Sequence, residues 1–120
     1  MKTVLFLCSV VALAVAQTYD ASNDNFDIEG LVKDDAALQR YTNCFIRNTD
    51  CDEIATDFKK DLKEVYEQSC AKCTPAQKHI LKKYIEALKQ KLPNEYQEFK
   101  KTYDPEGKYS LALETAIATA

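Results

Sequence analysis

The arrangement of the cysteines constrains this chain more than any other feature. Four of them, Cys44, Cys51, Cys70 and Cys73, follow the spacing C-x6-C-x18-C-x2-C, and a fifth, Cys8, stands alone near the N-terminus. An even set of closely spaced cysteines is typical of small secreted proteins that disulfides hold together. The fifth cysteine therefore needs a separate explanation.

The N-terminal segment supplies that explanation, because residues 1–16 have the features of a secretory signal peptide. A lysine precedes an apolar run over residues 4–15, and small residues at the end of the run form a cleavage signature. The run is shorter than the roughly 20 apolar residues that a membrane-spanning helix needs. We predict cleavage after Ala16, which removes Cys8. Residues 17–120 then form one secreted, extracellular domain without stable membrane insertion.

Apolar residues recur at helical spacing through most of the mature chain. Three stripes carry the pattern: Leu38, Tyr41, Phe45 and Ile46; then Ile54, Phe58, Leu62, Val65 and Tyr66; then Ile80, Leu81, Tyr84, Ile85, Leu88 and Leu92. Two glycines and three prolines are too few turn residues for a many-stranded barrel. The sequence therefore predicts an all-α fold of five or six short helices.

Two helix boundaries can be located from local chemistry. Thr74 is a good N-cap, Pro75 suits the first helical position, and Gln77 completes a capping box. Pro93 should end that helix, because the residue before a proline is disfavoured in the α region. We expect Asn94 to cap the short helix that follows.

The polar and acidic segment that precedes the helices, residues 17–27, has no helical periodicity. Chain termini of this composition are commonly poorly ordered. We expect the extreme N-terminus of the mature chain to be mobile.

The four remaining cysteines permit three pairings, and spacing alone cannot choose among them. Oxidation and the position of each pair at a joint between helical patterns favour Cys44–Cys51 and Cys70–Cys73. A redox-active C-x-x-C at residues 70–73 would need a βαβ context, which is absent. A zinc site is a second alternative, but C-x6-C is a poor zinc knuckle and secretion favours oxidation.

The chain lacks the residues from which catalytic sites are commonly assembled. His79 is its only histidine, so no histidine-pair metal site and no robust catalytic triad can be built. Eleven lysines in residues 59–101 are interspersed with six acidic residues, which indicates a solvated surface in place of a nucleic-acid site. We expect a non-enzymatic protein with no cofactor, no metal and no nucleic-acid partner.

The cysteine spacing and its flanking motifs resemble those of the insect chemosensory proteins. Tyr41 stands three residues before the first retained cysteine, Cys70-Ala71-Lys72-Cys73 is followed by Gln77-Lys78, and residues 103–109 read Tyr-Asp-Pro-x-Gly-x-Tyr. The acidic segment at residues 24–28 also agrees. The resemblance extends over about residues 24–109.

This resemblance implies six helices around an apolar channel, with the two local disulfides. It also implies binding of long-chain hydrophobic ligands such as fatty alcohols, esters, acids or semiochemicals. The family's aromatic channel positions correspond to Tyr41, to Tyr96, where many members have tryptophan, and to Tyr109. A tyrosine provides an apolar wall and one hydroxyl group that can orient a polar head group.

For the remaining candidates, the pattern leaves packed core and pocket equally open. The complete set of predicted ligand-binding residues is Tyr41, Phe45, Phe58, Leu62, Tyr66, Tyr84, Leu88, Tyr96 and Tyr109. We predict a secreted, monomeric carrier of small hydrophobic ligands, whose possible membrane receptor the sequence does not identify. The alternative is a secreted interaction or signalling protein that acts through its surface without a physiological ligand.

Overall fold

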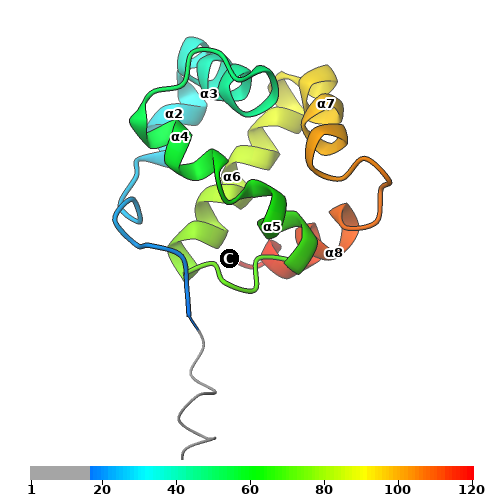
Figure 1. Cartoon of the computed structure of the whole chain (residues 1–120). Coiled ribbons are helices and arrows are strands. Elements are labelled where there is room, and N and C mark those ends of the chain that lie inside the picture. Colours follow the sequence, from blue (N-terminus) through cyan, green and yellow to red (C-terminus); the bar gives the residue numbers. More distant parts are fainter. Residues whose placement is uncertain (1–16) are drawn as a thin grey trace, which may run out of the picture.

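The computed structural model describes residues 17–120, and the predicted signal peptide with Cys8 lies outside this part of the chain. The described part contains α-helices and no strand (Figure 1). In chain order, the helices are α2 (Ile28–Lys33), α3 (Asp35–Arg47), α4 (Glu53–Lys59), α5 (Leu62–Gln68), α6 (Pro75–Lys91), α7 (Pro93–Tyr103) and α8 (Ser110–Ile117). The all-α prediction is confirmed.

The apolar stripe from Ile54 to Tyr66 is divided between two helices. Only Lys60 and Asp61 separate α4 from α5. If this pair counts as one broken helix, the described chain has the expected six helices. The break matters for the site below, because it places Asp61 at the wall of a cavity.

The long helix α6 runs through the middle of the molecule. It packs against α2, α7 and α8, while α3 packs against α2, α4 and α7. In Figure 1, α2, α3 and α4 lie at one end of α6, and α5 and α8 lie toward the other. No helix within residues 17–120 is long and apolar enough to cross a membrane.

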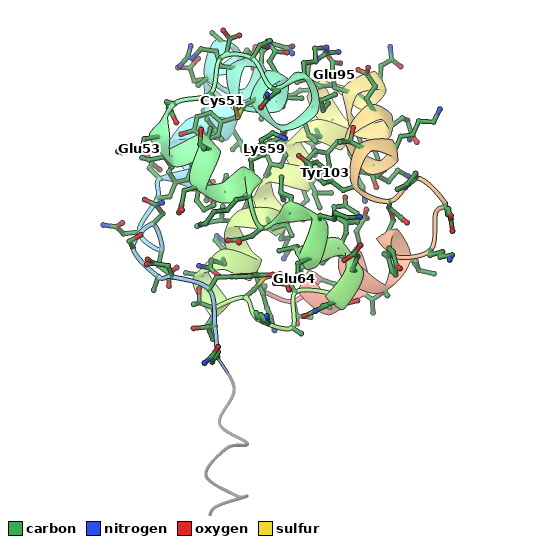
Figure 2. The ribbon with its side chains drawn as sticks, viewed as in Figure 1. Cys51, Glu53, Lys59, Glu64, Glu95 and Tyr103 are labelled. Atoms are coloured by element: carbon green, nitrogen blue, oxygen red, sulfur yellow. A yellow bond between two sulfur atoms is a disulfide. The ribbon has the colours of Figure 1, made fainter. Side chains whose placement is uncertain are left out.

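An aromatic cluster forms the centre of the core. Its members are Phe45, Tyr66, Tyr84, Phe99 and Tyr103, all buried, with contacting ring centroids 5.2 to 6.2 Å apart. These contacts are tilted or edge-to-face except for the stacked pair Tyr66–Tyr103, and they add to the stabilisation from apolar burial. Figure 2 shows one member, Tyr103, toward the interior, and the exposed Glu53 at the outside of the molecule.

The predicted start of α6 is confirmed, and the predicted start of α7 is wrong. The Thr74 hydroxyl oxygen accepts a hydrogen bond from the Gln77 amide at 3.1 Å, and the Gln77 side chain accepts one from the Thr74 amide at 3.0 Å. In α7, however, Pro93 takes the first helical position and Leu92 the cap position. Asn94 consequently lies inside the helix, because the fixed φ and missing N–H of a proline suit the first helical position.

Both disulfides connect neighbouring parts of the chain, as predicted. Cys44–Cys51 joins the end of α3 to the segment before α4, with 4.8 Å between the Cα atoms. Cys70–Cys73 lies in the connection between α5 and α6, with a Cα separation of 5.0 Å. Each bridge therefore fixes the joint between two successive helices.

The segment before α2 is held against the helices from Tyr19 onward, and the expected mobility of the extreme N-terminus stays a prediction for residues 17 and 18. The Tyr19 amide donates a hydrogen bond of 2.9 Å to the carbonyl oxygen of Lys72, in the α5–α6 connection. The Tyr19 ring is half-buried. We call residues 17–26 the N-terminal strap.

Candidate functional site

An apolar cavity of about 80 Å³ lies beneath the N-terminal strap, between α2, α3, α4, α5 and α6. Five of the nine residues predicted to bind ligand line it: Tyr41, Phe45, Phe58, Leu62 and Tyr84. They come from α3, the α4–α5 pair and α6, so three separate apolar stripes converge on one enclosure.

The other four predicted residues lie outside this cavity. Tyr66 and Leu88 are completely buried in packed core, and the Tyr66 ring is directed at Phe99 and Tyr103 of α7. Tyr109 is half-buried against the core and does not line the cavity. None of these three side chains borders the cavity, and their contact with ligand stays a prediction.

Tyr96, the fourth of these residues, lies in a surface groove between α7 and α8. Its hydroxyl group donates a hydrogen bond of 2.5 Å to Glu114. The ammonium groups of Lys100 and Lys89 lie 4.6 and 5.4 Å from the centroid of its ring. The Tyr96 ring is itself buried, and these two cation–π contacts cover the side of it that faces the groove.

Six further apolar residues of the cavity wall were not among the predicted site residues. They are Phe26, Ile28, Leu31, Val65, Ile80 and Leu81. Val65, Ile80 and Leu81 belong to the apolar stripes. The helical periodicity therefore predicted that they are buried, but not that they line a cavity. Phe26 gave no such signal, because it stands in the polar segment. Its ring centroid lies 5.7 Å from that of Tyr41 and 5.5 Å from that of Phe58.

Three tyrosines line the cavity, and the hydroxyl groups of two of them, Tyr41 and Tyr84, bond to groups outside it. The Tyr84 hydroxyl lies 2.7 Å from the Thr42 hydroxyl, and the Tyr41 hydroxyl donates a long hydrogen bond of 3.4 Å to Asp52. Neither partner lines the cavity. Burial and the Asp52 carboxylate raise the pKa of Tyr41 to about 12. Both tyrosines therefore present apolar ring surface to the cavity.

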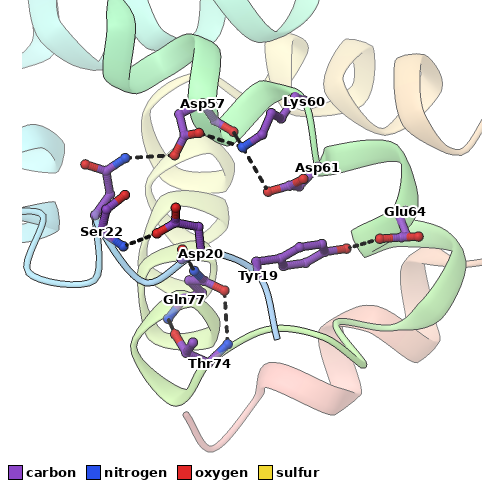
Figure 3. Close-up of polar contacts among 10 residues, drawn as sticks. Tyr19, Asp20, Ser22, Asp57, Lys60, Asp61, Glu64, Thr74 and Gln77 are labelled. Carbon is purple, nitrogen blue, oxygen red and sulfur yellow. Dashed lines mark hydrogen bonds and ion pairs between the residues drawn. The ribbon is translucent and has the colours of Figure 1, made fainter. Parts of the chain in front are cut away.

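Polar contacts hold the strap over the cavity (Figure 3). The Tyr19 hydroxyl donates to Glu64 of α5 at 2.8 Å. The Gln77 side chain donates to the carbonyl oxygen of Asp20 at 2.9 Å. These bonds tie the first part of the strap to α5 and to the first turn of α6.

A further bond ties the strap to α4, since the Asn23 side chain donates to Asp57 at 2.9 Å. Lys60 also contacts Asp57, with 2.5 Å between its ammonium nitrogen and the carboxylate. The hydrogen bond from Lys60 holds the pKa of Asp57 below its usual value, despite partial burial. The strap is thus attached to three helices by a small number of side-chain bonds.

The charged residues of the cavity wall are all acidic. Asp20, Asp57 and Asp61 line the cavity, and no lysine, arginine or histidine is among the described lining residues. Burial raises the pKa of Asp61. The cavity therefore combines an apolar interior with an acidic edge.

Nothing in the described residues 17–120 brings three or more histidine, cysteine or acidic side chains together as a metal site. His79 lies at the surface, with its Nδ1 atom 3.5 Å from the Ala120 carbonyl oxygen. All four cysteines of this part of the chain are in disulfides. The arrangement can enclose an apolar group and accept hydrogen bonds at one edge.

Three comparisons with known proteins agree with this arrangement. The model of the insect pheromone-binding family, A10/OS-D, matches residues 19–111. "Putative odorant-binding protein A10" of Drosophila melanogaster is 30% identical over 97 residues, which are 81% of this chain and 63% of that protein. The chain thus spans less than two thirds of this relative's length. "Allergen Tha p 1" of Thaumetopoea pityocampa is 29% identical over 109 residues, with 88% of this chain and 86% of that protein covered.

A solved structure also matches, the "Chemosensory Protein in Complex with bromo-dodecanol". It has a TM-score of 0.74 and 26% sequence identity, and the match covers 82% of this chain and 98% of that one. The match supports the helical architecture over nearly the whole of the neighbour. The ligand in that structure is a halogenated long-chain alcohol.

Proposed function

Since the chain belongs to the insect pheromone-binding family, A10/OS-D, we propose that it is a secreted carrier that reversibly binds long-chain apolar ligands. The cavity beneath the strap is the observation that carries this proposal, because its wall is largely aliphatic and aromatic. The bromo-dodecanol complex of the structural neighbour supports a ligand of this class. The ligand binds without covalent chemistry and is released unchanged.

The energetics of burial are sufficient for a useful affinity. A methylene group that leaves water for an apolar site gains about 0.8 kcal/mol. A micromolar dissociation constant needs about −8 kcal/mol, after the cost of association is met. A ligand of about 12 to 18 carbons therefore binds well even when only part of its chain is enclosed.

The cavity must widen to enclose a chain of that length. A cavity needs about 10 to 15 Å³ to hold one water molecule. The cavity of about 80 Å³ therefore has room for roughly six water molecules. The strap supplies four wall residues that lie outside the helices, and side-chain hydrogen bonds tie it to α4, α5 and α6. In our proposal, the strap shifts when a ligand enters, and Phe26 and Tyr19 then close over it.

Two features support secretion. Residues 1–16 have the sequence features of a secretory signal peptide. Both disulfides are of the kind that persists in an oxidising compartment. A protein that acts through its surface and binds no ligand needs only a solid core. The core of this chain contains a cavity, which favours the carrier.

A matched pair of tryptophan variants tests the proposal. The natural chain has no tryptophan, so one introduced indole reports its own surroundings. Leu81→Trp places it at the half-buried cavity wall, and Leu111→Trp places it in the surface groove, where the leucine is 83% exposed. Titration with dodecanol should change the fluorescence of the first variant saturably and leave the second unchanged.

Displacement of a naphthylamine probe from the unmodified protein provides an independent measurement. We expect the probe to bind and dodecanol to displace it at micromolar concentration. The proposal is wrong if the probe does not bind the unmodified protein and the Leu81→Trp variant gives no saturable response. A response from Leu111→Trp alone would place the ligand in the groove between α7 and α8.

A further inference from the structure

The carboxylate of Asp61 differs from the other two carboxylates of the cavity wall because it accepts no hydrogen bond from residues 17–120. Asp57 accepts from Asn23 and Lys60. Asp20 accepts from the main-chain amide of Ser22 at 2.8 Å. In residues 17–120, no N–H or O–H group donates to the Asp61 side chain, although Asp61 occupies the cap position of α5.

The nearby Lys60 forms an ion pair with Asp61 but no hydrogen bond. The ammonium nitrogen of Lys60 is 3.8 Å from the Asp61 carboxylate, which is too long for a hydrogen bond, and 2.5 Å from Asp57. Figure 3 shows Asp61 beside Lys60, with the Tyr19 ring running below them toward Glu64. The Asp61 side chain is 30% exposed, so it is partly removed from water at the edge of the cavity.

A partly desolvated carboxylate with free acceptors distinguishes between ligand head groups. A hydroxyl or ammonium group can donate to it, and a hydrogen bond to a charged acceptor is stronger than one between neutral groups. A second carboxylate at the same place is repelled, because like charges disfavour each other's ionised forms. Asp20 in the same wall adds to this repulsion, whereas the ion pair with Lys60 offsets the charge of Asp57.

We propose that Asp61 sets the head-group specificity of the cavity, which accepts long-chain ligands that donate a hydrogen bond and discriminates against fatty carboxylates. This inference rests on the proposed carrier function. It separates long-chain ligands into those whose head group donates a hydrogen bond and those whose head group is a carboxylate. Alcohols and alkylammonium ions share the required donor, and the experiment separates these two.

The test compares three ligands with the same chain and different head groups: dodecanol, dodecylammonium and dodecanoate. Each competes with the naphthylamine probe at neutral pH, first on the unmodified protein. We expect dodecanol and dodecylammonium to displace the probe, and dodecanoate to bind more weakly by a factor on the order of ten. Tighter binding of dodecylammonium than of dodecanol would show that charge attraction to Asp61 contributes to the affinity in addition to the hydrogen bond.

The variant Asp61→Asn should raise the affinity for dodecanoate by about tenfold. Since the Asp61 carboxylate does not cap α5, this change should leave the helix intact, which circular dichroism checks. The control is Asp50→Asn, which alters the net charge equally outside the cavity wall. The backbone of Asp50 is left-handed, with a φ of 60°, and asparagine readily adopts this conformation. Affinity for dodecanoate should stay unchanged in this control.

The outcomes separate the two proposals. If dodecanol and dodecanoate displace the probe equally from the unmodified protein, the carrier function stands and the specificity inference is wrong. If dodecanoate binds weakly to both the unmodified protein and Asp61→Asn, another group discriminates and the role of Asp61 is refuted. If none of the three ligands displaces the probe, both proposals fail.

Discussion

The hydroxyl group of Tyr84 lies 2.7 Å from the hydroxyl oxygen of Thr42 in the buried core between α3 and α6. Thr42 itself donates to the Leu38 carbonyl oxygen at 2.8 Å. Because a threonine hydroxyl has one hydrogen, Tyr84 must be the donor of the shared bond. The Tyr66 hydroxyl, which is also buried, has no hydrogen-bond partner in the described chain.

The two tyrosines should therefore respond differently to loss of the hydroxyl group. Tyr84→Phe removes the hydrogen bond to Thr42 and should lower the free energy of unfolding by about 1 kcal/mol. Tyr66→Phe removes a buried group without a partner and should leave stability unchanged or raise it. Urea unfolding of both variants measures the difference. An equal loss in the two variants would show that the Tyr66 hydroxyl is satisfied in solution.

Asp104 should be the most important single side chain for the attachment of α8. Its buried carboxylate accepts main-chain hydrogen bonds from Lys108, Tyr109 and Ser110 at 2.8 to 3.0 Å, and another from the Ser110 hydroxyl at 2.7 Å. Asp104→Ala leaves these donors unpaired and should cost about 2 to 3 kcal/mol of unfolding free energy. The isosteric Asp104→Asn should cost less, because one oxygen acceptor remains.

The same contacts predict a dependence of stability on acid. Burial alone would raise the pKa of Asp104, but the hydrogen bonds from Ser110, Tyr109 and Lys108 outweigh it and lower the pKa below 3.8. A carboxyl group with a lowered pKa stabilises the folded state above its unfolded pKa, and this contribution is lost as the pH falls through the folded pKa. The Asp104→Asn protein should lose less stability than the unmodified protein between neutral and acidic pH. Parallel pH profiles would contradict this account.

The helices were largely predictable because their signals are local. Thr74, Pro75 and Gln77 form the start of α6 by contacts within one turn, and the apolar stripes need only periodicity. The break at Lys60 and Asp61 was not predictable in this way, since the apolar stripe of residues 54–66 continues through it. The order of the N-terminal strap also has no local signal, because Tyr19 is held by groups that are 45 or more residues away.

The candidate site was predictable only in part, for a related reason. Periodicity identifies the buried face of a helix, but both cavity wall and solid core produce that pattern. Phe45 and Leu88 therefore looked alike, yet Phe45 borders the cavity and Leu88 lies in packed core. Phe26 and Asp61 could not be assigned to the cavity wall from the pattern, because Phe26 lies in the polar strap and Asp61 lies in the break between α4 and α5.

Removal of either disulfide should lower stability by a modest and similar amount. Chain entropy predicts a loss of about 2.5 kcal/mol for Cys44→Ala with Cys51→Ala, and about 2 kcal/mol for Cys70→Ala with Cys73→Ala. The loops are short, with sequence separations of 7 and 3 residues, so neither bridge ties distant parts of the chain together. Urea unfolding of the two double variants tests both values. A protein that fails to fold without one bridge would show that the bridge does more than restrict the unfolded chain.

Alkaline pH should unfold the protein through its buried tyrosines. Burial raises the pKa of Tyr103 to about 12, and burial followed by the charge of Asp52 raises that of Tyr41 to about 12, from an ordinary value of 10.0. Because the pKa is raised in the folded state, the unfolded chain releases these protons at a lower pH than the folded chain does. The two protonated tyrosines therefore stabilise the fold fully below pH 10.0, and this contribution is lost as the pH rises toward about 12. Tyrosinate absorbance should therefore rise late, together with loss of helical circular dichroism. In denaturant, the same tyrosines should titrate near the ordinary value. Ionisation of all seven tyrosines near pH 10.0 while the helices persist would mean that the rings of the aromatic core are accessible to water.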